Sequence, residues 1–492
     1  MSRAPRLSSA TLTQLPPQIM RPGYDRAAQK TGCVHFGVGA FHRAHQASYF
    51  DALMNAGKSD WQVLGVSMRS PAVGDQLNPQ DGLFTVNVRD GAQNRLQVVG
   101  SIREVVLAGK DSRRIIDALA SSDVSLATIT VTEKGYCLDP ATGALGLANA
   151  AIARDMENGM TPSSLPGLLC AGLAERRAAN VGPLTILSCD NLSNNGVAAR
   201  QAVVGFAAET NEDLARWIER ECAFPSSMVD RIVPATTQAD IDALERKIGL
   251  RDEATVSTEP FSQWVVEDRF AARRPPLDMA GVQFTSDVAG WEHAKLRLLN
   301  AAHSSMAYLG ALAGFDFIHE AIAFPPLKAH VEALWDEQEA TLRPTPGLNV
   351  REYRVRLLER FSNPALHHRT RQIAMDGSQK LPPRLVAPLR ERRRSGLTCP
   401  NQCLAIAAWM RWQLGQDETG RAYTVDDPLA NETRRRLRDT HSDPQAMVHA
   451  LLGVESVFPP VLASDDNVVG ELTRSLGSLL NLGARETLSR RF

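Results

Sequence analysis

The sequence predicts an α/β protein whose first half is a doubly wound parallel sheet and whose second half is mainly α-helical. In the first half, short β-branched runs alternate with helical patterns, and strands separated by helices are typical of a parallel sheet covered on both faces. From about Asp287 the β-rich runs nearly vanish, and long Leu-, Ala- and Arg-rich helical patterns follow. We therefore expect one domain over residues 1–286 and a second over residues 287–492.

Individual elements follow from local patterns, because apolar runs indicate buried strands and a 3.6-residue period indicates helices. Pro275 and Pro276 with the stretch 281–287 are interpreted as the joint, since two prolines cannot continue a helix and glycine permits a bend. The predicted strands are Val34–Gly37, Val63–Ser67, Phe84–Arg89, Leu126–Val131, Leu184–Cys189 and Met228–Val233. The predicted helices cover residues 44–57, 111–120, 163–179, 195–221, 291–313, 327–340, 350–361 and 401–413.

The composition gives no support for a protein that binds nucleic acid or membranes. The 492 residues carry 54 Lys and Arg against 55 Asp and Glu, and this balance gives no electrostatic argument for a nucleic-acid or membrane partner. No stretch approaches the roughly 20 apolar residues of a membrane helix, and the first 17 residues lack the apolar core of a signal peptide. We expect a cytoplasmic enzyme with a small-molecule substrate; its oligomeric state stays open, and a monomer is plausible.

The cysteines give no sign of a metal site. Seven of them are scattered along the chain without regular spacing, as expected for reduced thiols. Cys399 and Cys403 form a C-x-x-x-C pair, but the sequence offers no second ligand pair to complete a zinc site. We therefore expect no bound metal.

Residues 34–46, VHFGVGAFHRAHQ, predict the first turn of a dinucleotide-binding fold. Gly37 would permit the tight turn after an apolar strand, and Gly39 would let the backbone approach a pyrophosphate at the start of a helix near His42. His42 replaces the third glycine of the usual fingerprint, so an ordinary strand-to-helix turn is the alternative. No carboxylate or cysteine completes a metal site with His42 and His45, which favours hydrogen bonding at the helix start over metal binding.

The second predicted strand leads to Arg69, where an acidic partner for the coenzyme ribose would be expected. An arginine there could pair with a 2′-phosphate, which would favour NADP, or stack beside an adenine. From these residues alone, both NAD and NADP remain open.

The segment 290–310 carries the most informative polar set. At about 100° per residue, Lys295, Asn300 and His303 fall at about 0°, 140° and 80° around a helix, with Glu292 at about 60°. The helix is otherwise apolar, and burying the ammonium group of Lys295 costs free energy that a functional role would have to justify. Oxidation of a secondary alcohol supplies one, because a desolvated lysine can take the hydroxyl proton while an amide stabilises the alkoxide and a histidine orients the substrate. The alternative is a snorkelling lysine with a capped asparagine and a core histidine.

Two further segments carry candidate polar groups. Asn191 in SCDNLSNNG follows a strand and could face the reacting oxygen; the alternative is an Asn-rich turn. Asp230 in MVDRIVP stands inside an apolar run, where a salt bridge to Arg231 or another arginine is the alternative to a site role. The basic run 384–394 is either a solvated helix face or a phosphate or carboxylate site.

Six motifs together resemble one family, the mannitol dehydrogenase and D-mannonate oxidoreductase family of polyol-specific long-chain dehydrogenases. The resemblance covers about residues 30–480. The motifs, in chain order, are GVGAFHRAHQ (37–46), TVTEKGY (130–136), SCDNLSNNG (188–196), TEPFSQWVVED (258–268), KLRLLNAAHSSMAYLG (295–310) and RFSNPALHHRTRQIAMDGSQKLPPR (360–384).

The resemblance implies a Rossmann-type N-terminal domain, a mainly α-helical C-terminal domain, a metal-independent active site and NAD in preference to NADP. The family's K-x-x-x-x-N-x-x-H motif falls on Lys295 as general acid/base, Asn300 as oxyanion donor and His303 as substrate-positioning residue. Asn191 matches a second amide donor. The substrate-binding positions implied are Asp230, Lys380, Arg384 and Glu292. The cofactor-binding positions implied are Gly37, Gly39, Phe41, His42, Arg69, Glu133 and Lys134.

Within the family, the closing motif with VSMRSP after the second strand looks more like fructuronate reductases than mannitol 2-dehydrogenases. The latter tend to carry an acidic residue near position 69 and lack QKLP-x-R. A sugar acid would also suit the cations Lys380, Arg384 and Arg371, because arginine binds carboxylates bidentately. We therefore expect interconversion of D-mannonate and D-fructuronate, with D-mannitol to D-fructose or another polyol or aldonate as the alternative.

Overall fold

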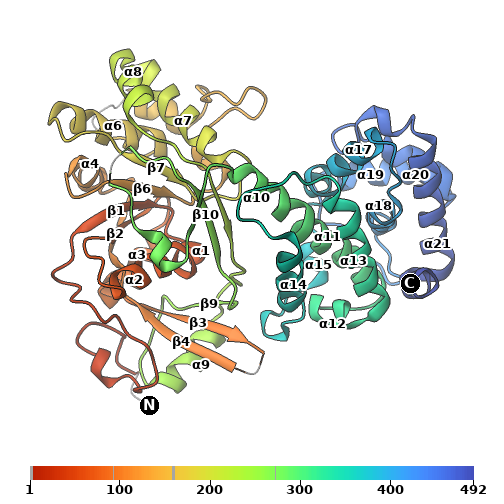
Figure 1. Ribbon diagram of the computed structural model, residues 1–492, viewed down its shortest axis with the longest axis horizontal. Helices are drawn as coiled ribbons and strands as arrows, with labels where there is room; N and C mark the ends of the chain where they lie inside the picture. Colours follow the sequence, from red (N-terminus) through yellow and green to blue (C-terminus); the bar gives the residue numbers. More distant parts are fainter. Residues whose placement is uncertain (1–3, 92, 158–160, 272) are drawn as a thin grey trace. The chain divides into compact units, whose positions relative to one another are not determined.

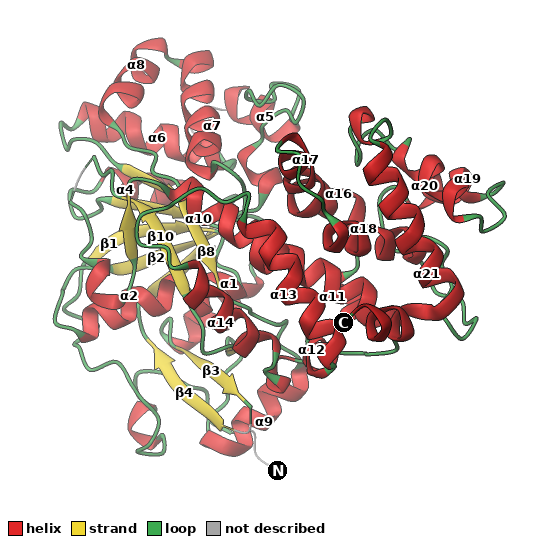
Figure 2. Cartoon of the chain, turned by 45° about the vertical axis from the view of Figure 1, so that its right-hand side comes forward, coloured by secondary structure: helices red, strands yellow, loops and turns green. Residues whose placement is uncertain are grey.

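The computed structural model describes residues 4–91, 93–157, 161–271 and 273–492. Over this part, the chain forms two compact units, Met1–Ala289 and Gly290–Phe492. Strands occur in the first unit, whereas the described residues of the second form helices and loops (Figure 1, Figure 2). The sequence analysis had placed the boundary between residues 286 and 287.

A parallel sheet forms the centre of the first unit. In the described residues it has five strands in the order β5-β2-β1-β6-β7. Figure 1 labels β1, β2, β6 and β7 of this sheet. The order reverses between β1 and β6, and doubly wound sheets bind ligands at such a reversal, beyond the carboxyl ends of the strands. These strands are β1 (Thr31–Phe36), β2 (Gln62–Ser67), β5 (Ile102–Leu107), β6 (Leu126–Ile129) and β7 (Thr185–Ser188).

Two predicted strands form, but outside this sheet. The run Phe84–Arg89 becomes β3, which pairs antiparallel with β4 and parallel with β9. The run Met228–Val233 becomes β8, which pairs antiparallel with β10. Strand β10 also pairs with β11, and β11 lies within residues 281–287, the stretch expected to join the two domains. Apolar runs identify strands, but the pairing partner depends on tertiary contacts. These strands are β3 (Phe84–Asp90), β4 (Gln93–Val99), β8 (Ser227–Asp230), β9 (Val256–Thr258), β10 (Gln263–Glu267) and β11 (Gln283–Thr285).

The helices of the first unit correct two predicted ranges. The helix expected over residues 44–57 begins earlier, at Ala40, and is interrupted at His45 (φ −117°, ψ −92°). The helix expected over residues 195–221 is two helices, because the Asn211 side chain caps the second by accepting the Leu214 N–H. The helices are α1 (Ala40–Ala44), α2 (Gln46–Asn55), α3 (Ala72–Leu77), α4 (Ser112–Ala120), α5 (Ala150–Glu157), α6 (Leu165–Ala178), α7 (Asn195–Thr210), α8 (Glu212–Glu221) and α9 (Gln238–Ile248).

Both faces of the parallel sheet are buried, as its continuous apolar strands require. On one face, Val34 and Phe36 enter a core shared with α4, α6 and α7. On the other, Cys33 and Leu126 pack in a core with residues of α2 and with Trp264 of β10. Neighbouring residues of one strand thus enter opposite cores. This confirms the predicted doubly wound α/β fold.

The second unit is mainly α-helical, as predicted. Its most buried helices are α11 and α18. Among the described residues, no helix combines the length and apolarity needed to cross a membrane. The helices are α10 (Val288–Ala294), α11 (Ala301–Leu312), α12 (Ile318–Ala323), α13 (Pro325–Glu339), α14 (Val350–Phe361), α15 (Thr370–Ile373), α16 (Gly377–Leu381), α17 (Ala387–Arg394), α18 (Pro400–Trp412), α19 (Ala430–Leu437), α20 (Pro444–Leu452) and α21 (Asp466–Arg491).

A π-helical turn over Lys295–Asn300 joins α10 to α11. Its hydrogen bonds run from residue i to i+5, so the turn is wider than an α-helical one, and side chains can donate to its carbonyls where the bonding pattern changes. The buried Trp335 supplies one such bond, because its indole N–H donates to the Leu298 carbonyl at 2.8 Å. Arg384 supplies another, to the Asn300 carbonyl at 3.4 Å. Neighbouring helices therefore hold the π turn open.

A second π turn, Pro382–Val386, joins α16 to α17 and contacts the first. Pro382 and Pro383 have no N–H to continue α-helical bonding, which gives a local reason for the wider turn. The Gln338 amide donates to the Arg384 carbonyl here at 3.1 Å. Helix α13 thus supplies donors to both π turns, Trp335 to the first and Gln338 to the second.

Trp335→Phe tests the support of the first π turn. Removing the indole N–H leaves the Leu298 carbonyl without this donor, and an unsatisfied buried carbonyl costs about 1–3 kcal/mol. Trp409→Phe is the matched control, because Trp409 is equally buried and its indole nitrogen has no hydrogen-bond partner among the described residues. Urea unfolding should show the larger loss for Trp335→Phe; equal losses would contradict the role of this bond.

Candidate active site

The nucleotide-site residues predicted from the sequence gather at one edge of the parallel sheet. Gly37 follows β1, Arg69 follows β2, Glu133 and Lys134 follow β6, and Asn191 follows β7. These four strands are neighbours in the sheet (Figure 1). The edge is therefore the carboxyl end of the strands on both sides of the reversal, where a dinucleotide binds in this fold.

The two glycines of the first turn differ in why they are needed. Gly37 has φ +97°, and a Cβ there would lie 2.2 Å from the Thr130 carbonyl oxygen. The fold therefore requires glycine at this position, with or without a bound ligand. Gly39 has φ −97°, and the nearest atom to a Cβ there is the Gly37 oxygen at 3.8 Å. The protein thus leaves the space beside Gly39 open. Open space beside this backbone is what close approach of a pyrophosphate needs.

Two stacked histidines lie inside the core behind this turn. The rings of His35 and His42 are 3.4 Å apart, and both side chains are fully buried. The two ring nitrogens of His35 form hydrogen bonds with the hydroxyl groups of Thr128, at 2.8 Å, and Thr130, at 2.9 Å. Among the described residues, neither ring nitrogen of His42 has a hydrogen-bond partner, so the helix-start hydrogen bond expected of His42 is not formed. His42 supports the turn from within the core, and Phe41 stacks on His45 at 5.0 Å.

Sequence reasoning missed Asp190, which holds the loop after β6. Its side chain is 8% exposed, and its carboxylate accepts the N–H groups of Val131 at 3.0 Å and Thr132 at 2.9 Å. It also accepts the Tyr136 hydroxyl at 2.8 Å. Burial raises the pKa of Asp190. A signal was present, because an aspartate directly after an apolar strand is buried and must find donors.

Asp230 ends β8 and is 5% exposed, opposite Gln263 of β10. Arg231, the ion-pair partner considered from the sequence, donates to the main-chain oxygens of Glu259, at 3.1 Å, and Ala44. Burial lowers the pKa of Arg231 to about 10. Arg231 therefore ties main-chain segments together, and Asp230 keeps its candidate role as a polar group at a strand end.

In the second unit, the first π turn changes how the predicted catalytic residues lie. Bonds from i to i+5 place Asn300 over Lys295, instead of about 140° away as α-helical geometry predicts. His303 follows three residues later, on the next turn of the same face. Lys295 is 9% exposed, and Glu292 lies partly buried one turn before it. The π turn brings the predicted residues onto one side of the helix.

His303 is held neutral by its surroundings. Its ring centroid lies 4.8 Å from that of Phe361 and 5.8 Å from that of His368. Desolvation lowers its pKa well below the usual value, and charge from Arg360, Arg384 and neighbouring groups lowers it further. In the described part of the chain, its Nε2 atom has no hydrogen-bond partner. A neutral imidazole in this state can donate one hydrogen bond and accept another.

Two predicted substrate-binding cations lie beside this histidine. Arg384 donates to Ser304 Oγ at 3.1 Å, and burial lowers its pKa to about 10. Lys380 donates to the carbonyls of Ile373 and Met375 at 3.2 and 2.5 Å, and desolvation followed by the charge of Arg384 lowers its pKa.

Arg371, the third cation considered from the sequence, lies next to Asp417 at 3.8 Å. Its guanidinium carbon is 5.1 Å from the centre of the Tyr423 ring. The structure therefore gives Arg371 partners of its own, and Lys380 and Arg384 remain the candidate carboxylate-binding pair.

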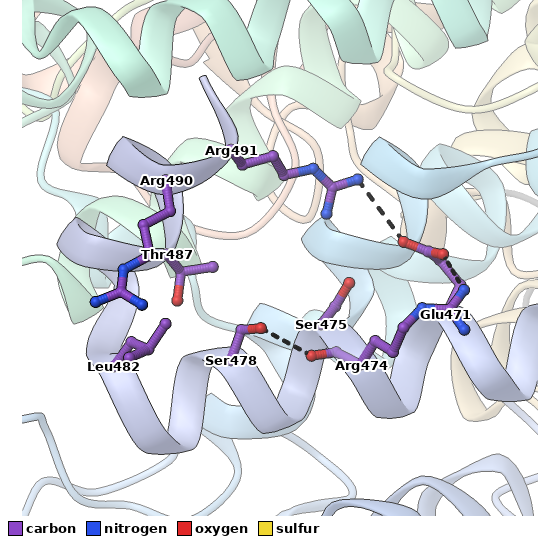
Figure 3. Close-up of a pocket in the computed structure, with 8 residues that line it drawn as sticks. All are labelled: Glu471, Arg474, Ser475, Ser478, Leu482, Thr487, Arg490 and Arg491. Atoms are coloured by element: carbon purple, nitrogen blue, oxygen red, sulfur yellow. Dashed lines mark hydrogen bonds and ion pairs between the residues drawn. The ribbon is translucent and has the colours of Figure 1, made fainter.

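A hollow of about 370 Å³ lies at the kink of α21 (Figure 3). Glu471 pairs with Arg474 and Arg491, and Arg490 pairs with Glu486. The arginines of this hollow are therefore paired with acids. Among the described residues, no group of three or more His, Cys, Asp or Glu side chains is placed to hold a metal ion.

Comparison with known proteins decides the family. Residues 31–279 match the model of the mannitol dehydrogenase Rossmann domain, and residues 287–480 match the mannitol dehydrogenase C-terminal domain. The chain belongs to the mannitol dehydrogenase family. This confirms the resemblance inferred from the six motifs, and it makes the protein an oxidoreductase of this family.

Similar proteins within the family differ in substrate. D-mannonate oxidoreductase of Escherichia coli is 39% identical over 476 residues, covering 96% of this chain and 98% of that protein. A mannitol 2-dehydrogenase of Phaeosphaeria nodorum is 38% identical over 503 residues, covering 99% and 87%. Mannitol 2-dehydrogenase of Pseudomonas fluorescens, solved as a ternary complex with NAD and D-mannitol, is 37% identical with a TM-score of 0.84, covering 99% of both chains. Identity alone therefore does not distinguish a sugar acid from a polyol.

Replacing each glycine of the first turn separates folding from coenzyme binding. Gly37→Ala should lose about 2 kcal/mol or more of stability, because of its positive φ and the contact with Thr130. Gly39→Ala should stay within about 0.5 kcal/mol of wild type but raise the NADH dissociation constant about tenfold or more, because its methyl group fills the open space. Thermal unfolding and NADH fluorescence titration measure the two effects. Unchanged NADH binding by Gly39→Ala would contradict a coenzyme at this turn.

The histidine stack gives a pH-dependent stability. Burial lowers the pKa of His35 to about 3, whereas the unfolded chain takes up this proton near pH 6.5, so the unfolded state binds more protons over about pH 3–6.5. The contribution of His35 to stability is therefore lost as the pH falls through this range. Between about pH 7 and 4.5, wild type should lose up to about 1.4 kcal/mol per pH unit more than His35→Gln. A difference that does not vary with pH would rule this out.

Proposed function

We propose that this member of the mannitol dehydrogenase family interconverts D-mannonate and D-fructuronate, with NAD as coenzyme and Lys295 as general acid/base. The observation that carries the sugar-acid substrate is the cationic pair Lys380 and Arg384 beside the neutral His303. Among the described residues, the charges of Asp376 and Asp427 act on Lys380 but not on Arg384, so the pair can still accept an anion such as a substrate carboxylate.

The open space beside Gly39 fits a nicotinamide coenzyme, since it lies at the reversal of strand order. When bound, such a coenzyme accepts or supplies the hydride. Arg69, Glu133 and Lys134 are exposed at the same sheet edge and are proposed to contact it. NAD is favoured over NADP because the similar Pseudomonas fluorescens enzyme was solved with NAD. Dissociation constants for both coenzymes test this choice.

Lys295 is proposed to move the proton. Its side chain is nearly buried, and desolvation favours the neutral amine that can accept a proton from the substrate hydroxyl. In the reverse direction, the ammonium returns that proton to the oxygen of the former carbonyl. Asn300, brought over Lys295 by the π turn, is proposed to donate its amide N–H to the same oxygen.

The remaining groups are proposed to hold the substrate. Neutral His303 offers one donor and one acceptor to neighbouring hydroxyls. Asn191 is proposed as the second amide donor, and Asp230 and Glu292 as acceptors for substrate hydroxyls.

An alternative substrate is D-mannitol, oxidised to D-fructose. It is favoured by the 37% identity to the Pseudomonas fluorescens enzyme solved with D-mannitol. The chemistry at Lys295 would be unchanged, since both reactions oxidise a secondary alcohol.

Lys295→Ala tests the proposed acid/base. General acid/base catalysis contributes about 10²–10⁴-fold, so kcat should fall by that factor while the NADH dissociation constant stays near that of wild type. Steady-state kinetics and NADH fluorescence measure the two quantities. Unchanged NADH consumption by the variant would show that Lys295 does not move the proton.

Lys380→Met tests the substrate carboxylate; Arg384 is left in place because it also donates to the Asn300 carbonyl of the first π turn. A hydrogen bond to a charged group is worth about 1.5–3 kcal/mol, so kcat/KM for D-mannonate should fall about 10–150-fold, with a much smaller loss for D-mannitol. Arg474→Met, which removes an exposed arginine paired with Glu471, is the control and should leave both values unchanged. Equal losses for both substrates would exclude carboxylate binding by Lys380. A tenfold or greater preference of the wild type for D-mannitol, roughly 1.4 kcal/mol, would favour the alternative function.

A further inference from the structure

The loop that follows β6 contains a strained residue. Thr132 has φ +67° and ψ +166°, a conformation that essentially only glycine adopts without strain. Its side chain is exposed, so core packing does not require a threonine there. The loop passes directly beside the coenzyme turn, since the Thr130 oxygen is the atom that excludes a Cβ at Gly37. Strain of this kind persists only where surrounding groups hold the backbone, and it is concentrated at functional sites.

The Asp190 carboxylate is the group that holds this loop. One oxygen accepts the Thr132 N–H, and the other accepts both the Val131 N–H and the Tyr136 hydroxyl. The Tyr136 hydroxyl also bonds Ser188 Oγ at 2.5 Å, at the end of β7. The carboxylate therefore fixes both ends of the stretch that carries Glu133 and Lys134.

The main chain of Asp190 is held by a second residue, Asn195. The Asn195 amide donates to the Asp190 carbonyl at 2.9 Å and to the Ser227 carbonyl at 2.7 Å, and it accepts the Ser227 N–H at 3.0 Å. The residue after Asp190 is Asn191, the proposed second amide donor. One hydrogen-bonded unit thus runs from the loop after β6, through Asp190, to the backbone of Asn191.

We propose that Asp190 is a positioning residue that holds the strained loop at Thr132 in the geometry required for coenzyme binding and aligns Asn191 with it. This inference rests on the proposed function, because it assigns coenzyme contacts to the loop and an amide role to Asn191. Asp190 itself stays behind the loop and acts through these neighbours. The threonine at position 132 is retained in a strained conformation because the carboxylate fixes its backbone.

Asp190→Asn tests the carboxylate, with Asp51→Asn as the matched control. Asp51 is also buried and accepts a main-chain N–H, from Gly100 at 2.8 Å, and a tyrosine hydroxyl, from Tyr24 at 2.7 Å. Gly100 precedes β5, so this control lies at the amino end of the sheet. Both variants should lower the melting temperature.

D190N alone should raise the NADH dissociation constant or lower kcat by about tenfold or more relative to D51N. NADH fluorescence and steady-state kinetics measure these values. A D190N enzyme that matches D51N in both would overturn the proposal.

Thr132→Gly gives a second test that does not depend on the stability of D190N. Glycine relieves the strain, so the melting temperature should equal or exceed that of wild type, while the loosened loop should raise the NADH dissociation constant about threefold or more. Asn180→Gly is the control, because Asn180 also has a positive φ of 54° but follows α6, outside the proposed site.

N180G should leave NADH binding unchanged. A T132G protein that binds NADH like wild type, or that melts below it, would refute the proposal. If D190N does not fold, NADH binding and the melting temperature of T132G test the proposal on their own.

These measurements separate this inference from the proposed function. The dissociation constant is measured without a sugar, so the identity of the substrate does not affect it. A wild-type protein that binds neither NADH nor NADPH would refute the proposed function. A wild-type protein that binds NADH, with D190N equal to D51N, would refute the positioning role alone.

Discussion

The π turn over Lys295–Asn300 is the constraint on which the proposed catalytic site depends. An α-helix would turn the side chains of these two residues about 140° apart, whereas a bond from i to i+5 places one over the other. Trp335 and Arg384 support the turn, because each donates to one of its carbonyls. Stability of the second unit and geometry of the proposed chemistry are therefore supported by the same contacts.

Burial sets the charge states around this turn. His303 and His368 are held neutral, the latter by desolvation that lowers its pKa to about 4, while Lys380 and Arg384 remain cationic beside them. Neutral imidazoles add no positive charge to the cluster, yet they keep both donor and acceptor capacity. This cluster suits the proposed substrate, an aldonate, which has several hydroxyls and one carboxylate.

The sequence predicted those parts of the fold that local patterns determine. Strands β1, β2, β6 and β7 are apolar runs, and the turn at Gly37 needs glycine for a reason visible in its own neighbourhood. The sheet membership of β3 and β8 was wrong, because strand pairing is decided by distant segments.

The candidate site could be predicted only in part, for the same physical reason. The residue types at Lys295, Asn300 and His303 were evident, but their common face was not, since the π turn depends on donors from α13 and the second π turn. Asp190 was missed because its partners, Val131 and Thr132, lie almost sixty positions earlier. The His42 side chain was expected to form hydrogen bonds at the helix start, whereas it stacks on His35 inside the core.

The most direct test of proton transfer by an amine at position 295 is chemical rescue of Lys295→Ala with small primary amines of graded basicity. Added amine should restore part of kcat, and the logarithm of the restored rate should rise with amine pKa with a slope between 0 and about 1. Rescue that is absent for every amine small enough to enter the space, or that is independent of amine pKa, would contradict proton transfer by Lys295.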